Sequence, residues 1–160
     1  MSFNELLIPT GAAGAILTDS RFNIVLYTGN RPSTVSVNTG FKPDLGIIFP
    51  RSYADHRTVF SSSFDGDIIG LQNHGAKESF SALDIVSDGF EVGNSGQVNT
   101  ASGTLVVYAW GANGGTVADN TNGDITSSVQ VGPGGSFSIA TYTGNGSSNQ
   151  TVGHGLSDTC

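Results

Sequence analysis

Histidine, cysteine and carboxylate side chains are the groups in this sequence that could act as nucleophiles, bases or metal ligands. His56, His74 and His154 each stand in a turn-like segment, and none belongs to an HExxH or HxH pattern. The sequence also contains no GxSxG elbow and no phosphate-binding loop. We therefore predict that the protein is not an enzyme, with no catalytic residues and no cofactor.

The single cysteine, Cys160, is the last residue of the sequence. No intramolecular disulfide and no cysteine-based metal site can form from one cysteine. We expect a free thiol on a loose terminus. The alternative is an interchain disulfide at a symmetry axis.

Acidic residues stand beside glycines in three segments, which read FDGDIIG, SDGFEVG and NTNGDIT. Each segment could supply oxygen ligands to calcium, but none reproduces the DxDxDG spacing of a calcium-binding loop. Asp and Asn next to Gly are far more often ordinary turn residues. We therefore predict turns at these positions and no metal site.

The segment RSYADHR is the densest group of positive side chains in the sequence. Its Arg51, Tyr53, His56 and Arg57 could bind an acidic glycan or an acidic surface on a partner subunit. A solvated loop with one or two local ion pairs is the plainer interpretation, and we favour it.

Composition places the chain among all-β proteins. Charged residues make up only 12 %, and the polarity comes from Ser, Thr, Asn and 23 Gly, which favour turns over helices. The net charge of −7 and the lack of a basic patch argue against nucleic acid as a partner. The N-terminus has no basic lead, and no stretch approaches the ~20 apolar residues of a membrane span, so we expect no secretion signal and no membrane partner.

Short apolar or alternating runs separated by turn residues predict the elements that would position any site. From Phe22 onward the pattern indicates roughly ten strands of four to eight residues, with turn signals every ten or so. We predict a jelly-roll-like β-sandwich of antiparallel strands over residues 21–160. Residues 1–20 are small and apolar and are broken by Pro9 and Gly11, so we predict an N-terminal arm with a possible helical turn at its start.

The run GTLVVYAWGA is the strongest predicted strand. Its two alternating sets of side chains are both apolar, so we expect it to be covered on both faces, by an arm or by a partner. We predict that the arm and the second face of this strand form an interface. The residues assigned to that interface are Leu6, Leu7, Ile8, Val106, Tyr108 and Trp110.

A repeated segment begins and ends the strand-rich part of the sequence. FNIVLYTGNRPSTVSVNTGF, from Phe22 to Phe41, aligns without a gap to FSIATYTGNGSSNQTVGHGL, from Phe137 to Leu156, with nine of twenty positions identical. Only four residues follow the second copy, so we expect its strand to pair within this domain or with a neighbouring subunit. We predict related edge or neighbouring positions for the two copies in one sandwich.

The order of these segments resembles a repeated β-rich module of virion structural proteins from tailed phages, especially marine and cyanobacterial ones. The resemblance rests on FNIVLYTGN, GFKPDLGIIFPRS, SDGFEVG, GTLVVYAWGANGG, TNGDITSSV and the second YTGN, and covers residues 21–156. It departs from the module at LGIIFPRS, where a lysine typical of the module is missing.

The resemblance implies a non-enzymatic virion component, assembled in the host cytoplasm and commonly oligomeric. We expect a capsid decoration or cement protein that contacts the major capsid protein or other virion subunits, with a homotrimer as the natural assembly. The alternative is a receptor-binding or glycan-binding module of a tail fibre or head fibre. A glycoside-degrading enzyme would need paired carboxylates across a cleft, and the sequence singles out no such pair.

Overall fold

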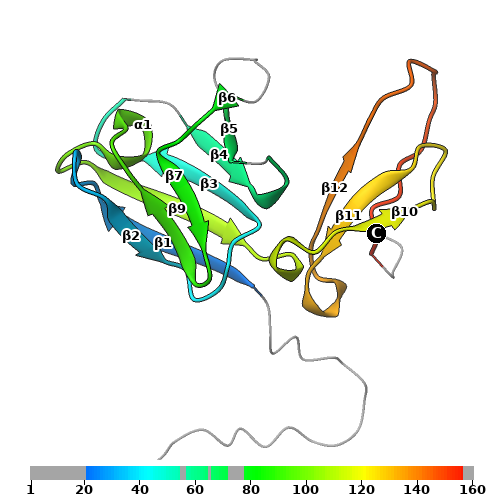
Figure 1. The fold of residues 1–160 in the computed structure, drawn as a ribbon, viewed down its shortest axis with the longest axis horizontal. Coiled ribbons are helices and arrows are strands. Elements are labelled where there is room, and N and C mark those ends of the chain that lie inside the picture. Colours follow the sequence, from blue (N-terminus) through cyan, green and yellow to red (C-terminus); the bar gives the residue numbers. More distant parts are fainter. Residues whose placement is uncertain (1–20, 55–56, 65, 72–77, 157–160) are drawn as a thin grey trace, which may run out of the picture.

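The computed structural model describes residues 21–54, 57–64, 66–71 and 78–156 and confirms the predicted all-β class (Figure 1). The described residues form twelve strands in three antiparallel sheets, with short helical turns between them. Leu6, Leu7, Ile8, His56 and Cys160 lie outside the described residues, as do His74 and the helical turn expected near the N-terminus.

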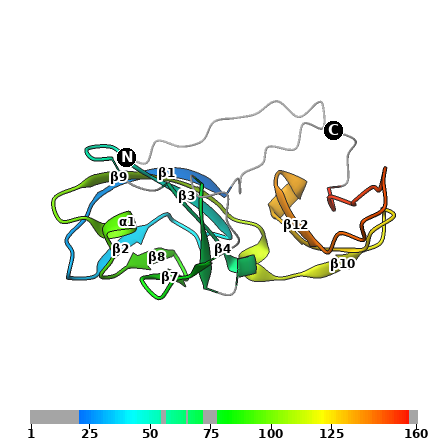
Figure 2. The ribbon, with the colours of Figure 1, turned by 90° about the horizontal axis from the view of Figure 1, so that it is seen from above.

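Two of the three sheets lie over one another as a sandwich, which Figure 2 shows as an upper and a lower layer. Sheet A contains, in spatial order, β1 (Phe22–Thr28), β9 (Thr104–Trp110), β3 (Leu45–Pro50), β4 (Thr58–Ser61), β5 (Asp67–Gly70) and β6 (Glu78–Ser79). Sheet B contains β2 (Val35–Asn38), β8 (Gly89–Val92) and β7 (Leu83–Val86).

The third sheet, sheet C, stands beside the sandwich (Figure 1). It contains β10 (Ala118–Asn120), β11 (Ser127–Val131) and β12 (Ser138–Tyr142). The helical turns are α1 (Gly96–Asn99), η1 (Ser62–Phe64), η2 (Asn113–Gly115) and η3 (Pro133–Gly135). Ser95 caps α1, because its hydroxyl accepts a hydrogen bond from the Gln97 amide.

The core lies between sheets A and B and follows the two-residue period of the strands. On β9, Leu105, Val107 and Ala109 are fully buried, as the alternation predicts. The rings of Phe60 and Phe90 meet from opposite sheets with centroids 5.0 Å apart. Opposite Phe60 in the register is Gly46, where an added Cβ would lie 2.1 Å from the phenyl ring. A glycine is therefore required there for the ring to enter the core.

A network of buried polar groups joins sheet C to the sandwich. The buried Asp44 carboxylate accepts hydrogen bonds from the amides of Ala112 and Gly114. The Ser62 hydroxyl lies 2.8 Å from Asp44 Oδ1 and 3.1 Å from Gln130 Oε1 on β11, while Gln130 Nε2 donates to Ser63. These bonds hold β11 against η1, because breaking them would leave a buried carboxylate and amide without partners.

The strands of sheet C differ from the sequence-based expectations in two places. β10 falls within ANGGTVADNTNGD, residues 112–124, whose composition predicts a long loop because Val117 and Ala118 are its only candidate core residues, and the three residues of β10 pair with β11. β12 is the strand that opens the second copy of the repeat, and it pairs only with β11. The opening strands of both copies are edge strands, but the expectation that they share one sandwich is wrong: β1 belongs to sheet A and β12 to the separate sheet C.

Candidate interface on the outer face of sheet A

Three adjacent strands of sheet A carry a continuous apolar surface on the side that faces away from sheet B. The antiparallel register of β1, β9 and β3 sets their outward side chains in three rows. The rows are Leu26–Val106–Phe49, Ile24–Tyr108–Ile47 and Phe22–Trp110–Leu45. We call these nine side chains the outer face.

Exposure distinguishes the outer face from ordinary strand surface. Phe22 is 44 % exposed, Ile24 50 % and Leu26 62 %. The six side chains from β9 and β3 are half-buried against one another. Their packing leaves a shallow depression lined by Ile47, Phe49, Val106 and Tyr108, with the Phe49 and Tyr108 rings edge to face at 5.8 Å. Contiguous apolar surface of this kind usually marks a contact with another protein segment.

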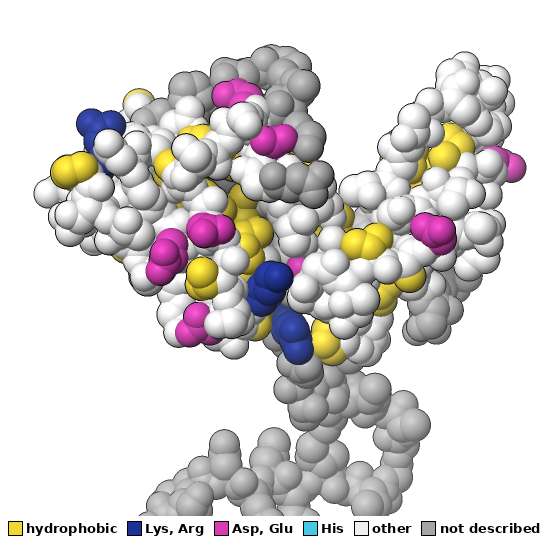
Figure 3. Space-filling model, in the orientation of Figure 1, with side chains coloured by type: hydrophobic (Ala, Val, Ile, Leu, Met, Phe, Trp, Pro, Cys, Tyr) yellow, Lys and Arg dark blue, Asp and Glu magenta, His cyan; other side chains and the backbone are white. Residues whose placement is uncertain are grey.

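The outward side of sheet B provides the contrast. Asp84 on β7, Glu91 on β8 and Ser36 on β2 form one row there, and Ser36 donates a hydrogen bond to Glu91. Acidic side chains are visible over this side of the molecule in Figure 3. The sandwich therefore has one polar, solvated side and one apolar side, and only the polar side has the composition expected of a water-exposed sheet.

The structure brings three of the predicted interface residues together. Val106, Tyr108 and Trp110 all lie on the outer face of β9, at the centres of its three rows. They are half-buried rather than covered, so the expectation of two covered faces on this strand holds only for the inner face among the described residues. At one end, Trp110 also stacks on Phe137 before β12, with centroids 6.0 Å apart.

The described residues of the arginine-containing segment differ in burial. Arg51 and Arg57 are exposed, whereas Tyr53 is half-buried, packs against the core and donates a hydrogen bond to the Gly96 carbonyl at 3.3 Å. The Arg51 amide donates to the Thr104 carbonyl, which extends the β3–β9 ladder. Tyr53 therefore has a structural contact, and a glycan-binding role for this segment stays a prediction.

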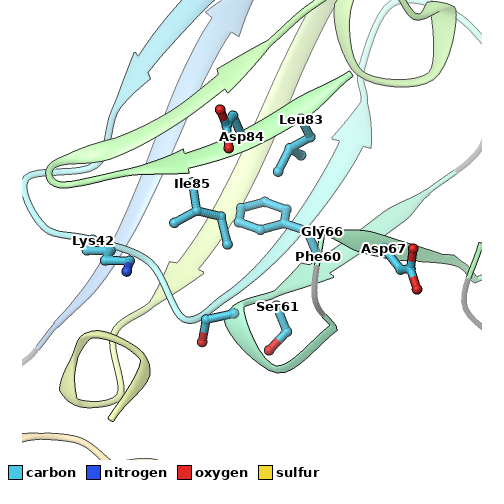
Figure 4. Close-up of a pocket in the computed structure, with 9 residues that line it drawn as sticks. Lys42, Phe60, Ser61, Gly66, Asp67, Leu83, Asp84 and Ile85 are labelled. Carbon is cyan, nitrogen blue, oxygen red and sulfur yellow. The ribbon is translucent and has the colours of Figure 1, made fainter. Parts of the chain in front are cut away.

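A pocket opens between the two sheets where β7 ends the narrower sheet B. It has a volume of about 150 Å³ and is lined chiefly by residues of β4, β5 and β7 (Figure 4). The Phe60 ring lies beside Leu83 and Ile85, while Asp84 points away from it. Lys42 Nζ, on the rim, lies 3.5 Å from the Gly114 carbonyl. The pocket therefore offers apolar surface for one small group rather than a paired acid and base.

Among the residues that the structure describes, two ionisable groups have shifted pKa values, and burial or hydrogen bonding explains each shift. Burial raises the pKa of the Tyr27 phenol far above its ordinary value, with a smaller contribution from Tyr53. Hydrogen bonds from the Thr151 hydroxyl and amide lower the pKa of the exposed Asp124 carboxyl. Both shifts accompany structural hydrogen bonds, since Tyr27 donates to the Val98 carbonyl and Asp124 accepts from Thr151.

Metal-ligating side chains do not gather in the described part of the chain: no group of three or more His, Cys, Asp or Glu is placed to hold an ion. Within the same residues, no helix has the length and apolar character to cross a bilayer.

Sequence reasoning missed most of the outer face. It identified the β9 side chains but not the flanking ones on β1 and β3, which are Phe22, Ile24, Leu26, Leu45, Ile47 and Phe49. The available signal was that FNIVL and LGIIF, like the β9 run, carry apolar residues at both alternating positions. The sequence did not show which strands are neighbours in the sheet. A row of side chains forms only when its three strands are paired.

Comparisons with known proteins identify one family. Neither the curated proteins nor the solved structures gave a significant match. A family model described as "domain of unknown function (DUF7483)" matches residues 20–160, which include all of sheets A, B and C and most of the chain. The chain therefore belongs to the DUF7483 family.

Proposed function

We propose that this protein is a non-enzymatic structural subunit of a phage virion, and specifically a capsid decoration or cement protein. Its mechanical role would be to bury the outer face of sheet A against other virion subunits, with the major capsid protein as the expected partner and a trimer as the expected assembly. The single observation that carries the proposal is the set of three apolar rows on one side of an otherwise polar sandwich.

Physical chemistry supports an assembly role for this surface. Burial of apolar area contributes roughly 25 cal/mol per Å², and large rigid side chains such as Tyr and Trp dominate the energetics of contact surfaces. Tyr108 and Trp110 occupy the central strand of the outer face, with apolar side chains on either side. The phage context comes from the sequence resemblance, which spans both the sandwich and sheet C.

The first test is the copy number in purified particles of the phage that encodes the chain. A decoration protein predicts one subunit or one trimer for every few coat proteins, measured by quantitative gel densitometry or mass spectrometry. A few dozen copies per particle would contradict a decoration role and favour the fibre alternative, which predicts that purified protein adheres to host cells and blocks adsorption.

The second test addresses the surface. Ile24→Lys and Leu26→Lys place charges on exposed positions of β1, so we expect little change in melting temperature but at least a tenfold loss of binding to particles stripped of the protein. Ser36→Lys on the exposed side of sheet B is the matched control and should bind as the unmodified protein does. Equal binding by all three variants would contradict the assignment of the outer face.

A further inference from the structure

The N-terminal segment, residues 1–20, joins the described structure at one corner of the outer face. We propose that this segment docks on the outer face of its own chain in the free subunit. The docking itself depends only on the described surface and on the sequence of the segment. Its consequence for assembly rests on the proposed function.

The point of entry places the segment beside the surface that needs cover. The Arg21 carbonyl accepts a hydrogen bond from the Gly111 amide at 2.8 Å, directly after β9. The next residue, Phe22, places its ring 5.0 Å from Trp110 in the third row of the outer face. The chain therefore reaches β1 at the end of the face, rather than from the polar side of the sandwich.

The segment is long enough to cover the face. An extended chain spans about 3.3 Å per residue, so Leu17 can lie up to about 13 Å from Arg21. Three strands spaced by about 4.8 Å place β1 and β3 about 10 Å apart, and three rows span about 13 Å along the strands. Pro9 and Gly11 separate a second apolar group, at Leu6 to Ile8, and permit a reversal of direction that returns it to the same face.

The chemistry of the segment matches that of the face. It contains apolar groups at Leu6–Leu7–Ile8 and at Ile16–Leu17, has no Lys or Arg, and has only two acidic residues, Glu5 and Asp19. The small residues between its apolar groups permit a close approach to the Tyr108 and Phe49 rings. The nine side chains of the face introduce no charge that would oppose this contact.

Tethering favours the chain's own face over that of a second copy. A short tether gives an effective concentration in the millimolar range, far above micromolar protein in solution. Geometry does not prevent contact, because Leu17 is only four residues from Arg21. Under the proposed function, a coat partner would have to displace the segment, and loss of docking would strengthen binding to particles.

Cross-linking in the full chain tests the docking directly. In a Cys160→Ser background, Leu17→Cys and Tyr108→Cys are combined and treated with a short bismaleimide. We expect a cross-linked monomer, identified by peptide mass spectrometry, at least fivefold more abundant than for Leu17→Cys combined with Glu91→Cys on sheet B. A cross-linked dimer, or a yield no greater than that of the sheet B control, overturns the proposal.

A point-variant series gives an independent readout. Ile16→Asp with Leu17→Asp should raise the fluorescence of the apolar-surface dye ANS several-fold while the circular dichroism of the folded protein stays the same, and should lower the melting temperature because the docked apolar contact is lost. Thr10→Asp with Thr18→Asp adds the same charge at polar positions and should leave the fluorescence unchanged. Equal fluorescence of the two double variants overturns the docking.

Particle binding separates this proposal from the proposed function. If docking and function both hold, the Ile16→Asp, Leu17→Asp variant binds stripped particles more tightly than the unmodified chain. A cross-linked monomer with no particle binding by any variant supports docking and contradicts the proposed function. Particle binding that depends on Leu26 without any intramolecular cross-link supports the function and overturns docking.

Discussion

The two copies of the Tyr-Thr-Gly-Asn sequence end edge strands of different sheets. In the first copy, at residues 27–30, the tyrosine hydroxyl donates to the Val98 carbonyl at 2.8 Å and the Asn30 amide donates to Asn99 Oδ1 at 2.7 Å. Gly29 is buried, and its amide donates to the Gly103 carbonyl. The first copy is therefore held by the α1 region at three successive points.

The second copy, at residues 142–145, makes local contacts. Tyr142 is 59 % exposed, and nothing lies within 4 Å of a Cβ added to Gly144. The Asn145 side chain donates to Gln150 and accepts from the Ser147 amide, both in the same exposed loop. The residues that the two copies share therefore specify a strand followed by a turn. Whether those residues are packed into the core depends on which other segment of the chain lies against them.

The first copy contacts the fully buried side chain of Asn99, whereas Asn145 of the second copy contacts only its own loop in the described structure. The Asn99 amide nitrogen donates to the carbonyls of Ser33, Val92 and Gly93, while its oxygen accepts from the Asn30 amide. One side chain at the end of α1 therefore connects the first copy of the repeat to the end of β8.

Among the substitutions that compare the two copies, replacing Asn99 should change the free energy of unfolding most. Asn99→Ala removes four hydrogen bonds that a fully buried side chain makes to partly buried or buried backbone groups, so we expect a loss of about 3 kcal/mol in the free energy of unfolding. Asn145→Ala, in the exposed copy, should change it by less than about 0.5 kcal/mol. Urea denaturation measures both, and similar losses would mean that the two copies are equally important to stability.

Adding a methyl group at Gly29 and at Gly144 tests the same difference between the two copies. A Cβ on Gly29 would lie 2.2 Å from the Thr100 carbonyl oxygen, so Gly29→Ala should cost about 2–3 kcal/mol through a forced backbone shift. Gly144→Ala meets open space and should be neutral or stabilising by up to about 1 kcal/mol. Thermal unfolding followed by circular dichroism checks both, and a tolerated Gly29→Ala would show that the Gly29–Thr100 approach is not required.

The tyrosines differ by one buried hydrogen bond. Tyr27→Phe leaves the Val98 carbonyl without its side-chain donor, so we expect a loss of about 1–2 kcal/mol. Tyr142→Phe should cost less than about 0.5 kcal/mol, since its side chain is exposed.

Tyr27 also predicts a pH dependence. Burial raises its pKa in the folded state, so above its ordinary value of 10.0 the unfolded phenol ionises while the folded one keeps its proton. The Tyr27 contribution to stability is therefore complete below pH 10.0 and is lost progressively as the pH rises above it. Urea midpoints measured between pH 8 and 11 should fall less steeply for Tyr27→Phe; parallel curves for the two proteins would contradict the burial of this phenol.

The smallest expected effect lies in sheet C. Asp124 accepts hydrogen bonds from the Thr151 amide and hydroxyl, which attach the segment that follows residues 142–145 beside Ile125. Its pKa is lowered, so this contact is present above the ordinary pKa of 3.8 and is lost as the pH falls through the lower folded-state value. Asp124→Asn should speed hydrogen exchange at the Thr151 amide with little change in global stability. Unchanged exchange would show that the carboxylate does not protect that amide.

Local sequence pattern was sufficient for the all-β class and for most strands. The run GTLVVYAWGA predicted a strand with Leu105, Val107 and Ala109 on one face, because side chains alternate along any strand, and the structure places that face in the core. The weaker strand at 118–120 was missed, since Ala118 and Asp119 have little strand propensity and depend on pairing with β11. The outer face was predicted only on β9, because the flanking residues on β1 and β3 lie more than 50 positions away from their β9 neighbours in the chain.

The sequence by itself determined the strands, the turns and the alternation of the two repeat copies, because these depend on backbone preferences and side-chain spacing within a few residues. Tertiary structure alone decided that Tyr27 packs against the core while Tyr142 is exposed, and that Ile24, Tyr108 and Ile47 form one row. Burial and contact depend on which distant strands pair and which sheet covers them. Two segments with the same local pattern therefore acquire different roles when only one lies opposite Asn99.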